Sequence, residues 1–159
     1  MPINIPDGLP AKKTLHEERI FALEEEVAEH QEIRPLRLAI LNLMPKKIQT
    51  ETQILRLISK SPIQVTCDFM RISSHKSKNT AADHLVTFYS TFDDFKDKNY
   101  DGLIITGAPI EDLKYEDVDY WDEFCRIVDW SQEHVFSSMY LCWGVLAGLY
   151  YCLLYPSPS

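Results

Sequence analysis

The chain has 159 residues, of which 45% are apolar and 25% are charged, and its formal net charge is −8. This composition is typical of a globular protein, and the length suffices for one domain with its own core. The acidic balance disfavours nucleic acid as a partner, because phosphate backbones attract basic surfaces. No segment has the pattern of a signal peptide, a membrane helix or a basic amphipathic helix, so we expect a cytoplasmic protein without a membrane partner.

The cysteines are the first candidates for chemistry. In a reducing compartment they are expected to be free thiols. No two of them form a CxxC pair, and no cluster of His and Cys has the spacing of a zinc site, so no metal site is predicted. The four are Cys67, Cys125, Cys142 and Cys152.

Residues 1–34 are polar and interrupted by prolines at both ends, and we interpret them as an N-terminal extension. Within them, residues 14–31 are rich in Glu and can form a helix, with Thr14 and Glu17 as a capping box. The apolar residues 20–23 fit a short extended segment equally well.

Residues 35–151 alternate between short apolar runs and segments with helical spacing. Such alternation predicts right-handed βαβ units and a doubly wound parallel sheet, that is, a flavodoxin-like α/β fold. The predicted strands are 36–43, 63–72, 100–106 and 135–141, and the predicted helices are 50–59, 81–89, 118–131 and 143–151.

The last residues, 152–159, are apolar and then alternate Pro and Ser. We interpret them as a tail outside the fold that results from truncation or a frameshift, because a doubly wound enzyme usually continues with further strands. From pattern alone, a complete small flavodoxin-like domain explains this length equally well.

Cys142 lies between an apolar strand and a helix with small residues, which is the setting of a nucleophile elbow. A sharp turn there lifts the sulfur above the sheet, and the helix N-terminus favours the thiolate. The following amide, that of Trp143, can donate to a developing oxyanion. A buried apolar cysteine is the alternative interpretation, because Tyr140 stands where such elbows usually have Gly.

A second turn, Thr106-Gly107-Ala108-Pro109, follows another predicted strand and can supply further oxyanion donors. The other cysteines lie within a strand, within a helix or in the tail. None of the five histidines is predicted at the carboxyl end of a strand, so the base for a thiol nucleophile is expected from later strands. This expectation favours a truncated chain over a complete small domain. The histidines are His16, His30, His75, His84 and His134.

Several motifs in order resemble the homoserine O-acyltransferases of methionine biosynthesis. The similarity runs from Met1 to about Tyr151, and the family continues for roughly as long again. The motifs are Arg34-Pro35-Leu36, residues 41–47 (LNLMPKK), Thr50-Glu51-Thr52, residues 101–109 (DGLIITGAP) and Cys142-Trp143-Gly144.

The resemblance implies a fold like that of class I glutamine amidotransferases, here truncated. It also implies acyl transfer from acyl-CoA to the hydroxyl of L-homoserine by a ping-pong route in which Cys142 is acylated and a later His–Glu pair assists. Gly107, Ala108 and Trp143 would be the oxyanion donors. Glu111 matches a position linked to acyl choice, where a carboxylate is typical of acetyl-CoA users because it repels a succinyl carboxylate. A solvated loop acid is the alternative for Glu111.

We therefore expect a homoserine O-acetyltransferase with acetyl-CoA as co-substrate and no bound cofactor, present as a fragment that is inactive by itself. Lys46 and Lys47 are candidate contacts for the CoA phosphates or the substrate carboxylate, or are surface charges. The family resemblance also suggests a homodimer. The alternatives are a homoserine O-succinyltransferase, a thiol amidohydrolase on the same fold, and a non-catalytic protein.

Overall fold

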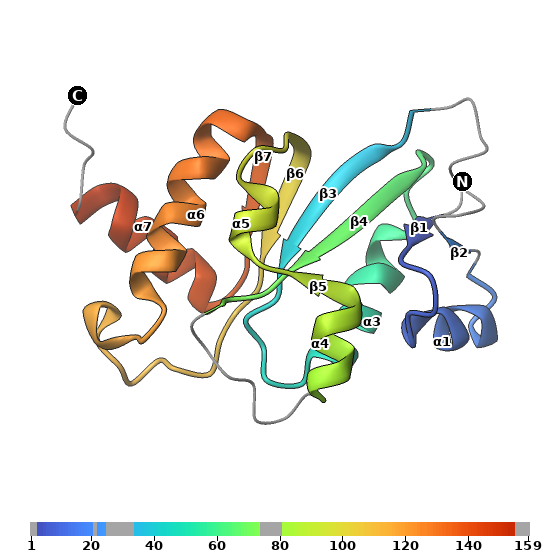
Figure 1. Cartoon of the computed structure of the whole chain (residues 1–159), viewed down its shortest axis with the longest axis horizontal. Helices are drawn as coiled ribbons and strands as arrows, with labels where there is room; N and C mark the ends of the chain where they lie inside the picture. The colour runs from blue at the N-terminus through green and yellow to red at the C-terminus, as the bar shows by residue number, and fades with distance from the viewer. Residues whose placement is uncertain (1–2, 21, 25–33, 74–80, 155–159) are drawn as a thin grey trace.

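The structure, a computed structural model, describes residues 3–20, 22–24, 34–73 and 81–154 (Figure 1). Its strands are β1 (Ile3–Ile5), β2 (Ala22–Glu24), β3 (Leu36–Leu41), β4 (Val65–Met70), β5 (Tyr89–Ser90), β6 (Tyr100–Ile105) and β7 (Val135–Tyr140). Its helices are α1 (Ala11–Glu17), α3 (Lys47–Ile58), α4 (Ala82–Phe88), α5 (Phe92–Phe95), α6 (Trp121–His134) and α7 (Trp143–Leu154), with a 3₁₀ turn η1 (Tyr115–Asp117).

The strands form one parallel sheet in the order β2-β1-β4-β3-β6-β7, and β5 pairs with the end of β4. Helices cover both faces, so the predicted parallel α/β fold is confirmed (Figure 1). Successive side chains of a strand point to opposite faces. Ala39 and Leu41 of β3 accordingly pack on the side of α6, whereas Ile40 packs on the side of α1 and α3.

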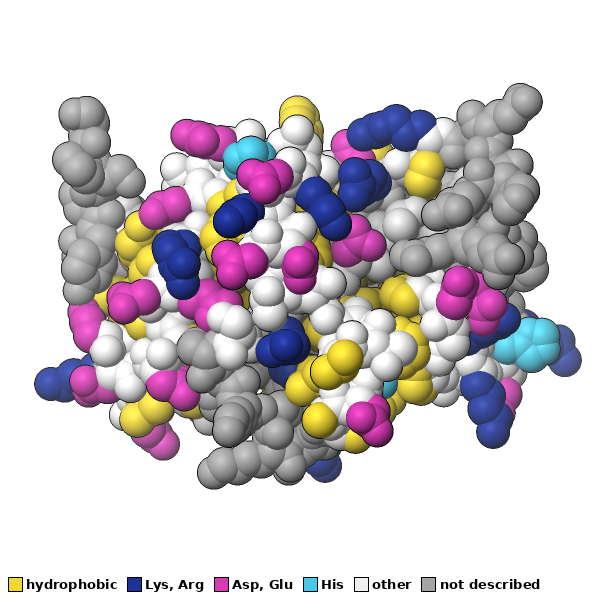
Figure 2. Space-filling view, viewed as in Figure 1, with side chains coloured by type: hydrophobic (Ala, Val, Ile, Leu, Met, Phe, Trp, Pro, Cys, Tyr) yellow, Lys and Arg dark blue, Asp and Glu magenta, His cyan; other side chains and the backbone are white. Residues whose placement is uncertain are grey.

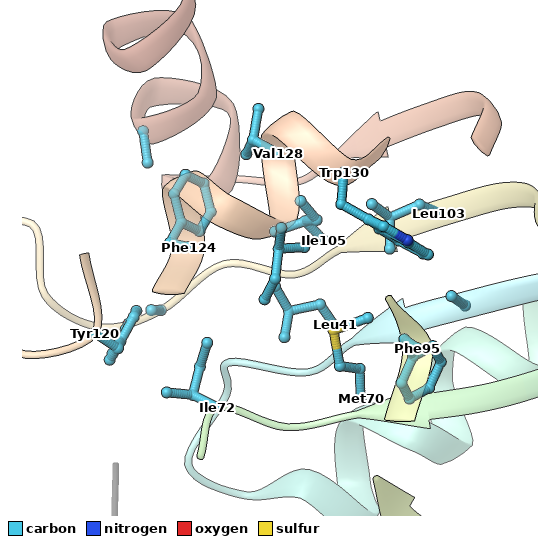
Figure 3. Close-up of a cluster of buried hydrophobic side chains, with 14 of the residues drawn as sticks. Leu41, Met70, Ile72, Phe95, Leu103, Ile105, Tyr120, Phe124, Val128 and Trp130 are labelled. Carbon is cyan, nitrogen blue, oxygen red and sulfur yellow. The ribbon is translucent and has the colours of Figure 1, made fainter. Parts of the chain in front are cut away.

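The core on the α6 side is rich in aromatic side chains (Figure 3). Phe124, fully buried on α6, lies between Trp121 and Trp143, with ring centroids 5.5 and 5.6 Å apart. Helix α6 is amphipathic as predicted, although it begins at Trp121 rather than Val118, after the 3₁₀ turn. Trp143 ties the first turn of α7 to this core, so it fixes the residue that follows Cys142.

The N-terminal segment is more ordered than the sequence indicated. Ile3 and Ile5 are buried in β1, which lies between β2 and β4 in the sheet. The predicted helix over 14–31 is wrong in its bounds: α1 spans Ala11–Glu17 and follows Pro10, and the chain turns at Arg19 with φ 59°. The alternative of a short extended segment is closer, since Ala22–Glu24 forms β2. The rest of that predicted helix lies outside the described residues.

The far edge of the sheet is open. β7 pairs only with β6 among the described strands, and its Phe136 and Met139 are 94% and 59% exposed. Helix α7 runs through Leu154 without a break, so no structural boundary falls at Cys152, where the predicted tail begins. Residues 155–159 of that tail lie outside the described residues. Within the described part, no helix has both the length and the apolar character needed to cross a membrane.

On the face shown in Figure 2, acidic and basic side chains are interspersed. No single-sign basic field covers this face, which agrees with the net charge of −8.

Candidate active site

The carboxyl ends of three neighbouring strands are joined by backbone hydrogen bonds. The Thr106 amide donates to the Leu41 carbonyl at 3.1 Å, and the Leu141 amide donates to the Ile105 carbonyl at 2.9 Å. In addition, the Leu43 amide donates to Thr106 Oγ1 at 2.8 Å. The ends of β3, β6 and β7 therefore form one connected edge, which is where ligands bind in open α/β sheets.

Cys142 lies on this edge, between the last residue of β7 and the first of α7, and is exposed. Its φ of 49° is in the left-handed region, which costs a residue with a Cβ roughly 1–2 kcal/mol. The amides of Gly144 and Val145 donate back to the carbonyls of Leu141 and Cys142 and close the turn. This is the strained strand–turn–helix geometry of a nucleophile elbow, so the buried-cysteine interpretation of Cys142 is wrong.

Two glycines let the elbow approach the loop after β6. A Cβ placed on Gly107 would lie 2.8 Å from Cys142 Cβ, and one on Gly144 would lie 2.9 Å from the Thr106 carbonyl oxygen. Neither distance allows a side chain without movement of the backbone. The loop after β6 and the elbow are thus in close contact. Glycine is needed on both sides of it, at Gly107 and at Gly144.

Three amides of the elbow and of the loop packed against it have no hydrogen-bond partner in the described part of the chain. Within the described residues, the amides of Gly107, Ala108 and Trp143 donate to no carbonyl or side chain. The Trp143 amide belongs to the first turn of α7, where a helix leaves its N–H groups unpaired. Their arrangement suits stabilisation of negative charge beside Cys142.

An open pocket of about 400 Å³ lies beside the thiol. It brings together Cys142, Gly107, Ala108 and Glu111, four of the residues predicted from the sequence, and helix α3 forms its other wall. Glu111 is exposed on the loop after β6. The full lining is Met44, Thr50, Gln53, Ile54, Leu57, Thr106, Gly107, Ala108, Pro109, Glu111, Leu141 and Cys142.

Lys46 and Lys47 do not line this pocket. Lys46 is the exposed N-cap residue of α3, whereas Lys47 is only 8% exposed and its Nζ donates to the carbonyls of Asn42 and Met44 at 2.6 and 3.1 Å. Burial lowers the pKa of Lys47 to about 8. Lys47 is therefore not a surface charge: its ammonium group holds the turn between β3 and α3.

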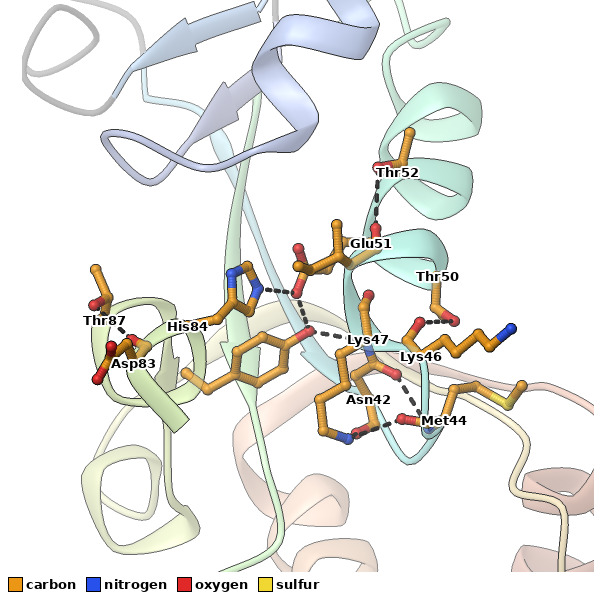
Figure 4. A network of polar contacts seen from close by, with 12 residues as sticks. Asn42, Met44, Lys46, Lys47, Thr50, Glu51, Thr52, Asp83, His84 and Thr87 are labelled. Atoms are coloured by element: carbon orange, nitrogen blue, oxygen red, sulfur yellow. Dashed lines mark hydrogen bonds and ion pairs between the residues drawn. The ribbon is translucent and has the colours of Figure 1, made fainter. Parts of the chain in front are cut away.

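The same turn is held by a buried polar network that sequence reasoning missed (Figure 4). Glu51 Oε1 accepts from the Tyr89 hydroxyl at 2.6 Å and lies 2.7 Å from His84 Nε2. The Asn42 side-chain amide donates to the Tyr89 oxygen at 2.8 Å, and burial together with Glu51 raises the pKa of Tyr89. The only sequence signal was the position of Glu51, one turn before Ile54 and Leu55 on the buried face of α3.

None of the described histidines can serve the thiol. His16 lies on α1, His84 on α4 against Glu51, and His134 at the end of α6, where its Nδ1 is 2.9 Å from Asn99 Oδ1. His30 and His75 lie outside the described residues. Cys67 is buried in β4, and its burial raises the pKa of the thiol. Among the described residues there is also no group of three or more His, Cys, Asp or Glu that could hold a metal ion.

Comparison with known proteins shows the family of the chain. A sequence profile described as homoserine O-succinyltransferase matches residues 2–156, which is nearly the whole chain. The chain belongs to this family. Its curated relatives in the homoserine O-succinyltransferase family include a homoserine O-acetyltransferase of Bifidobacterium adolescentis, 64% identical over 151 residues that cover 95% of this chain and 44% of the relative.

Two further relatives carry the same name. That of Clostridium acetobutylicum is 58% identical over 151 residues, covering 95% of this chain and 50% of the relative. That of Desulfitobacterium hafniense is 54% identical over 162 residues, covering all of this chain and 53% of the relative. The chain thus spans about half the length of the curated relatives it matches.

Proposed function

We propose that this chain carries the nucleophile of a homoserine O-acetyltransferase, in which acetyl-CoA acylates Cys142 and L-homoserine removes the acetyl group. The observation that carries the proposal is the exposed Cys142 at a left-handed elbow, which packs against the Gly107-Ala108 loop and lines with it a pocket of about 400 Å³. Family membership and the names of the relatives support the substrates.

In the first half-reaction the Cys142 thiolate attacks the carbonyl carbon of the acetyl thioester. The carbonyl oxygen becomes an oxyanion, which the amides of Gly107, Ala108 and Trp143 stabilise. The bond between that carbon and the CoA sulfur then breaks, and CoA leaves as a thiol after taking up a proton. In the second half-reaction the homoserine hydroxyl gives its proton to a general base and its oxygen attacks the acetyl carbon; the bond between that carbon and the Cys142 sulfur breaks, and Cys142 leaves as the thiolate.

The thiol needs a base, and none of the three described histidines lines the pocket. We assign that role to a His–Glu pair in the part of the family fold that corresponds to the other half of the relatives. The chain by itself is then acylated slowly and turns over poorly, because general base catalysis contributes about 10²–10⁴-fold.

Glu111 favours acetyl over succinyl as the transferred group. It lines the same pocket as Cys142, and a succinyl group on Cys142 would bring a second carboxylate into that pocket. Two like charges in one pocket disfavour binding. The name of the family profile refers to succinyl transfer and the names of the relatives to acetyl transfer, and Glu111 is our reason for choosing the latter. We place the reaction in the cytoplasm, with a homodimer as the expected assembly.

The test separates the two half-reactions. The protein is incubated with acetyl-CoA, freed of donor by gel filtration, and mixed with L-homoserine, and O-acetylhomoserine is measured by mass spectrometry. We expect the product to form in an amount equal to the acetyl groups lost from the protein, and the Glu111→Gly variant to accept succinyl-CoA better than the wild type does. Release of ammonia from glutamine, with no acetyl group taken from acetyl-CoA, would show a thiol amidohydrolase instead.

A further inference from the structure

The pocket beside Cys142 extends along helix α3. Four of its lining residues, Thr50, Gln53, Ile54 and Leu57, follow one another at helical spacing, so they form a single stripe on one side of the helix. At about 1.5 Å per residue, the stripe is about 10 Å long. Figure 4 shows Thr50 and Glu51 pointing to different sides of α3, so the residue that lines the pocket and the residue of the buried network do not compete for one side of the helix.

The stripe carries an exposed apolar side chain where solvent would favour a polar one. Leu57 is 70% exposed, although it lies within a regular helix whose other face supplies the buried Leu55. The Gln53 side chain is exposed beside it and offers an amide donor and acceptor. A surface that combines methyl groups with one amide suits an extended ligand made of methylene, methyl and amide groups.

A positive charge stands at the far end of the stripe. Lys60 follows Leu57 by three residues, in a turn that continues the helix, since the Lys60 amide donates to the Leu57 carbonyl at 3.3 Å. Spacing of three residues places both side chains on one side. Lys60 is exposed, and no ion pair joins it to a carboxylate within the described residues.

We propose that this stripe is the binding surface for the arm of the acyl donor. Resting on the proposed function, the inference assigns the amide-containing pantetheine chain of CoA to Gln53, Ile54 and Leu57, and the phosphates at its end to Lys60. The thioester then lies at the Thr50 end of the stripe. This end is nearest to Met44 and to the carboxyl edge of the sheet, on which Cys142 lies. The acyl group itself points toward Glu111.

The test measures binding without turnover. CoA or pantetheine is added at increasing concentration, and the rate of alkylation of Cys142 by iodoacetamide is followed by peptide mass spectrometry, which distinguishes it from the other three thiols. Both ligands should protect Cys142. The variant Leu57→Glu should raise the concentration needed for half protection at least about tenfold for both ligands. The reason is that burial of a leucine side chain supplies a large share of the binding free energy of such a ligand.

Two variants complete the design. Lys60→Glu should weaken protection by CoA severalfold and leave protection by pantetheine unchanged, because only CoA has the distal phosphates. Val86→Glu is the matched control, since Val86 is 77% exposed on α4 and lies outside the pocket, and it should change neither. Circular dichroism confirms that each variant is folded.

The outcomes are distinct. No protection of the wild type by either ligand, or equal half-protective concentrations for the wild type and Leu57→Glu, would overturn the assignment of the stripe. Loss of protection by pantetheine in Lys60→Glu would overturn the assignment of the phosphates. The proposed function fails separately, if acetyl-CoA and a short acetyl thioester such as S-acetyl-N-acetylcysteamine both leave Cys142 unmodified. If Cys142 is acetylated but Leu57→Glu does not change the half-protective concentrations, the assignment of the stripe is wrong and the proposed function stands.

Discussion

Gly107→Ala is the substitution whose effect the structure determines most closely. The added methyl carbon would lie 2.8 Å from Cys142 Cβ, 3.6 Å from the Trp143 nitrogen and 3.7 Å from Cys142 Sγ. Carbon atoms in contact prefer about 3.5–4.0 Å, so the first distance is too short by about 0.7 Å or more. Cys142 Cβ cannot rotate away, because it is bonded directly to the backbone of the elbow. Either the loop after β6 or the elbow itself must shift.

Overpacking of this kind costs about 1–3 kcal/mol of unfolding free energy. The shift also moves the sulfur relative to the Gly107, Ala108 and Trp143 amides, and displacements approaching 1 Å cost up to about 10²-fold in rate. We therefore expect a lower urea midpoint with an unchanged m-value, and an initial rate of Cys142 acetylation by acetyl-CoA reduced at least about tenfold.

Gly102→Ala is the matched control on β6, the strand that leads into the Gly107 loop. Its methyl carbon would lie 2.5 Å from Leu38 Cδ2, the end of a flexible side chain, and far from the thiol. It should lower stability no more than Gly107→Ala does, because the Leu38 side chain can move, and it should leave the acetylation rate unchanged. A Gly107→Ala protein with wild-type stability and a wild-type acetylation rate would refute the close packing of loop and elbow from which the site is built.

Three further changes test other parts of the structure. The free energy of unfolding of Cys142→Gly should exceed that of Cys142→Ala by roughly 1 kcal/mol, because only glycine adopts φ 49° without strain. Equal urea midpoints for the two variants would contradict the elbow geometry. Glu51→Ala should lower the free energy of unfolding by about 3 kcal/mol in urea denaturation, because it leaves the buried His84 and Tyr89 groups without their acceptor. A loss below about 1 kcal/mol would show that the network does not stabilise the fold. Lys47 has a folded pKa of about 8, below its unfolded value near 10.4, so the unfolded state binds the extra proton between these values and stability rises with pH there. Urea titrations should show the wild type gaining about 2.5 kcal/mol relative to Lys47→Met from pH 8 to 10.4, and a pH-independent difference would contradict the burial of the ammonium group.

The sheet and the elbow could be predicted because their signals are local. Each six-residue strand coincides with a predominantly apolar segment of the sequence. Cys142 stands directly between such a segment and a helix with glycines at close-packing positions. The loop Gly107-Ala108 was predicted for the same reason, as a turn that ends a strand. Strand ends of a parallel sheet meet at one edge, so the two turns had to come together.

The N-terminal strands could not be predicted in this way. β1 is only three residues long and is flanked by Pro2 and Pro6, and its pairing with β4 links Ile3 to Val65, far along the chain. Burial against distant strands decided its structure, and no local propensity reports that. The helix predicted over 14–31 failed similarly, because acidic composition favours a helix whereas pairing with β1 holds Ala22–Glu24 extended.

The buried network was missed because its contacts are non-local. Glu51 meets His84 and Tyr89 across 33 and 38 positions of sequence, and Asn42 meets Tyr89 across 47. Lys47 shows the same difficulty, since two adjacent lysines have the same sequence signature whether they are solvated or buried. In the structure one is exposed and the other is not.

The central claim is that the Cys142 thiol accepts the acyl group, and peptide mapping after exposure to acetyl-CoA tests it most directly. The account predicts a stable gain of one acetyl group on the peptide that contains Cys142, none on those of Cys67, Cys125 and Cys152, and none anywhere on the cysteines of a folded Cys142→Ser variant. Acetylation of another cysteine with Cys142 unmodified, or no adduct on the wild type even with a short acetyl thioester in excess, would contradict it.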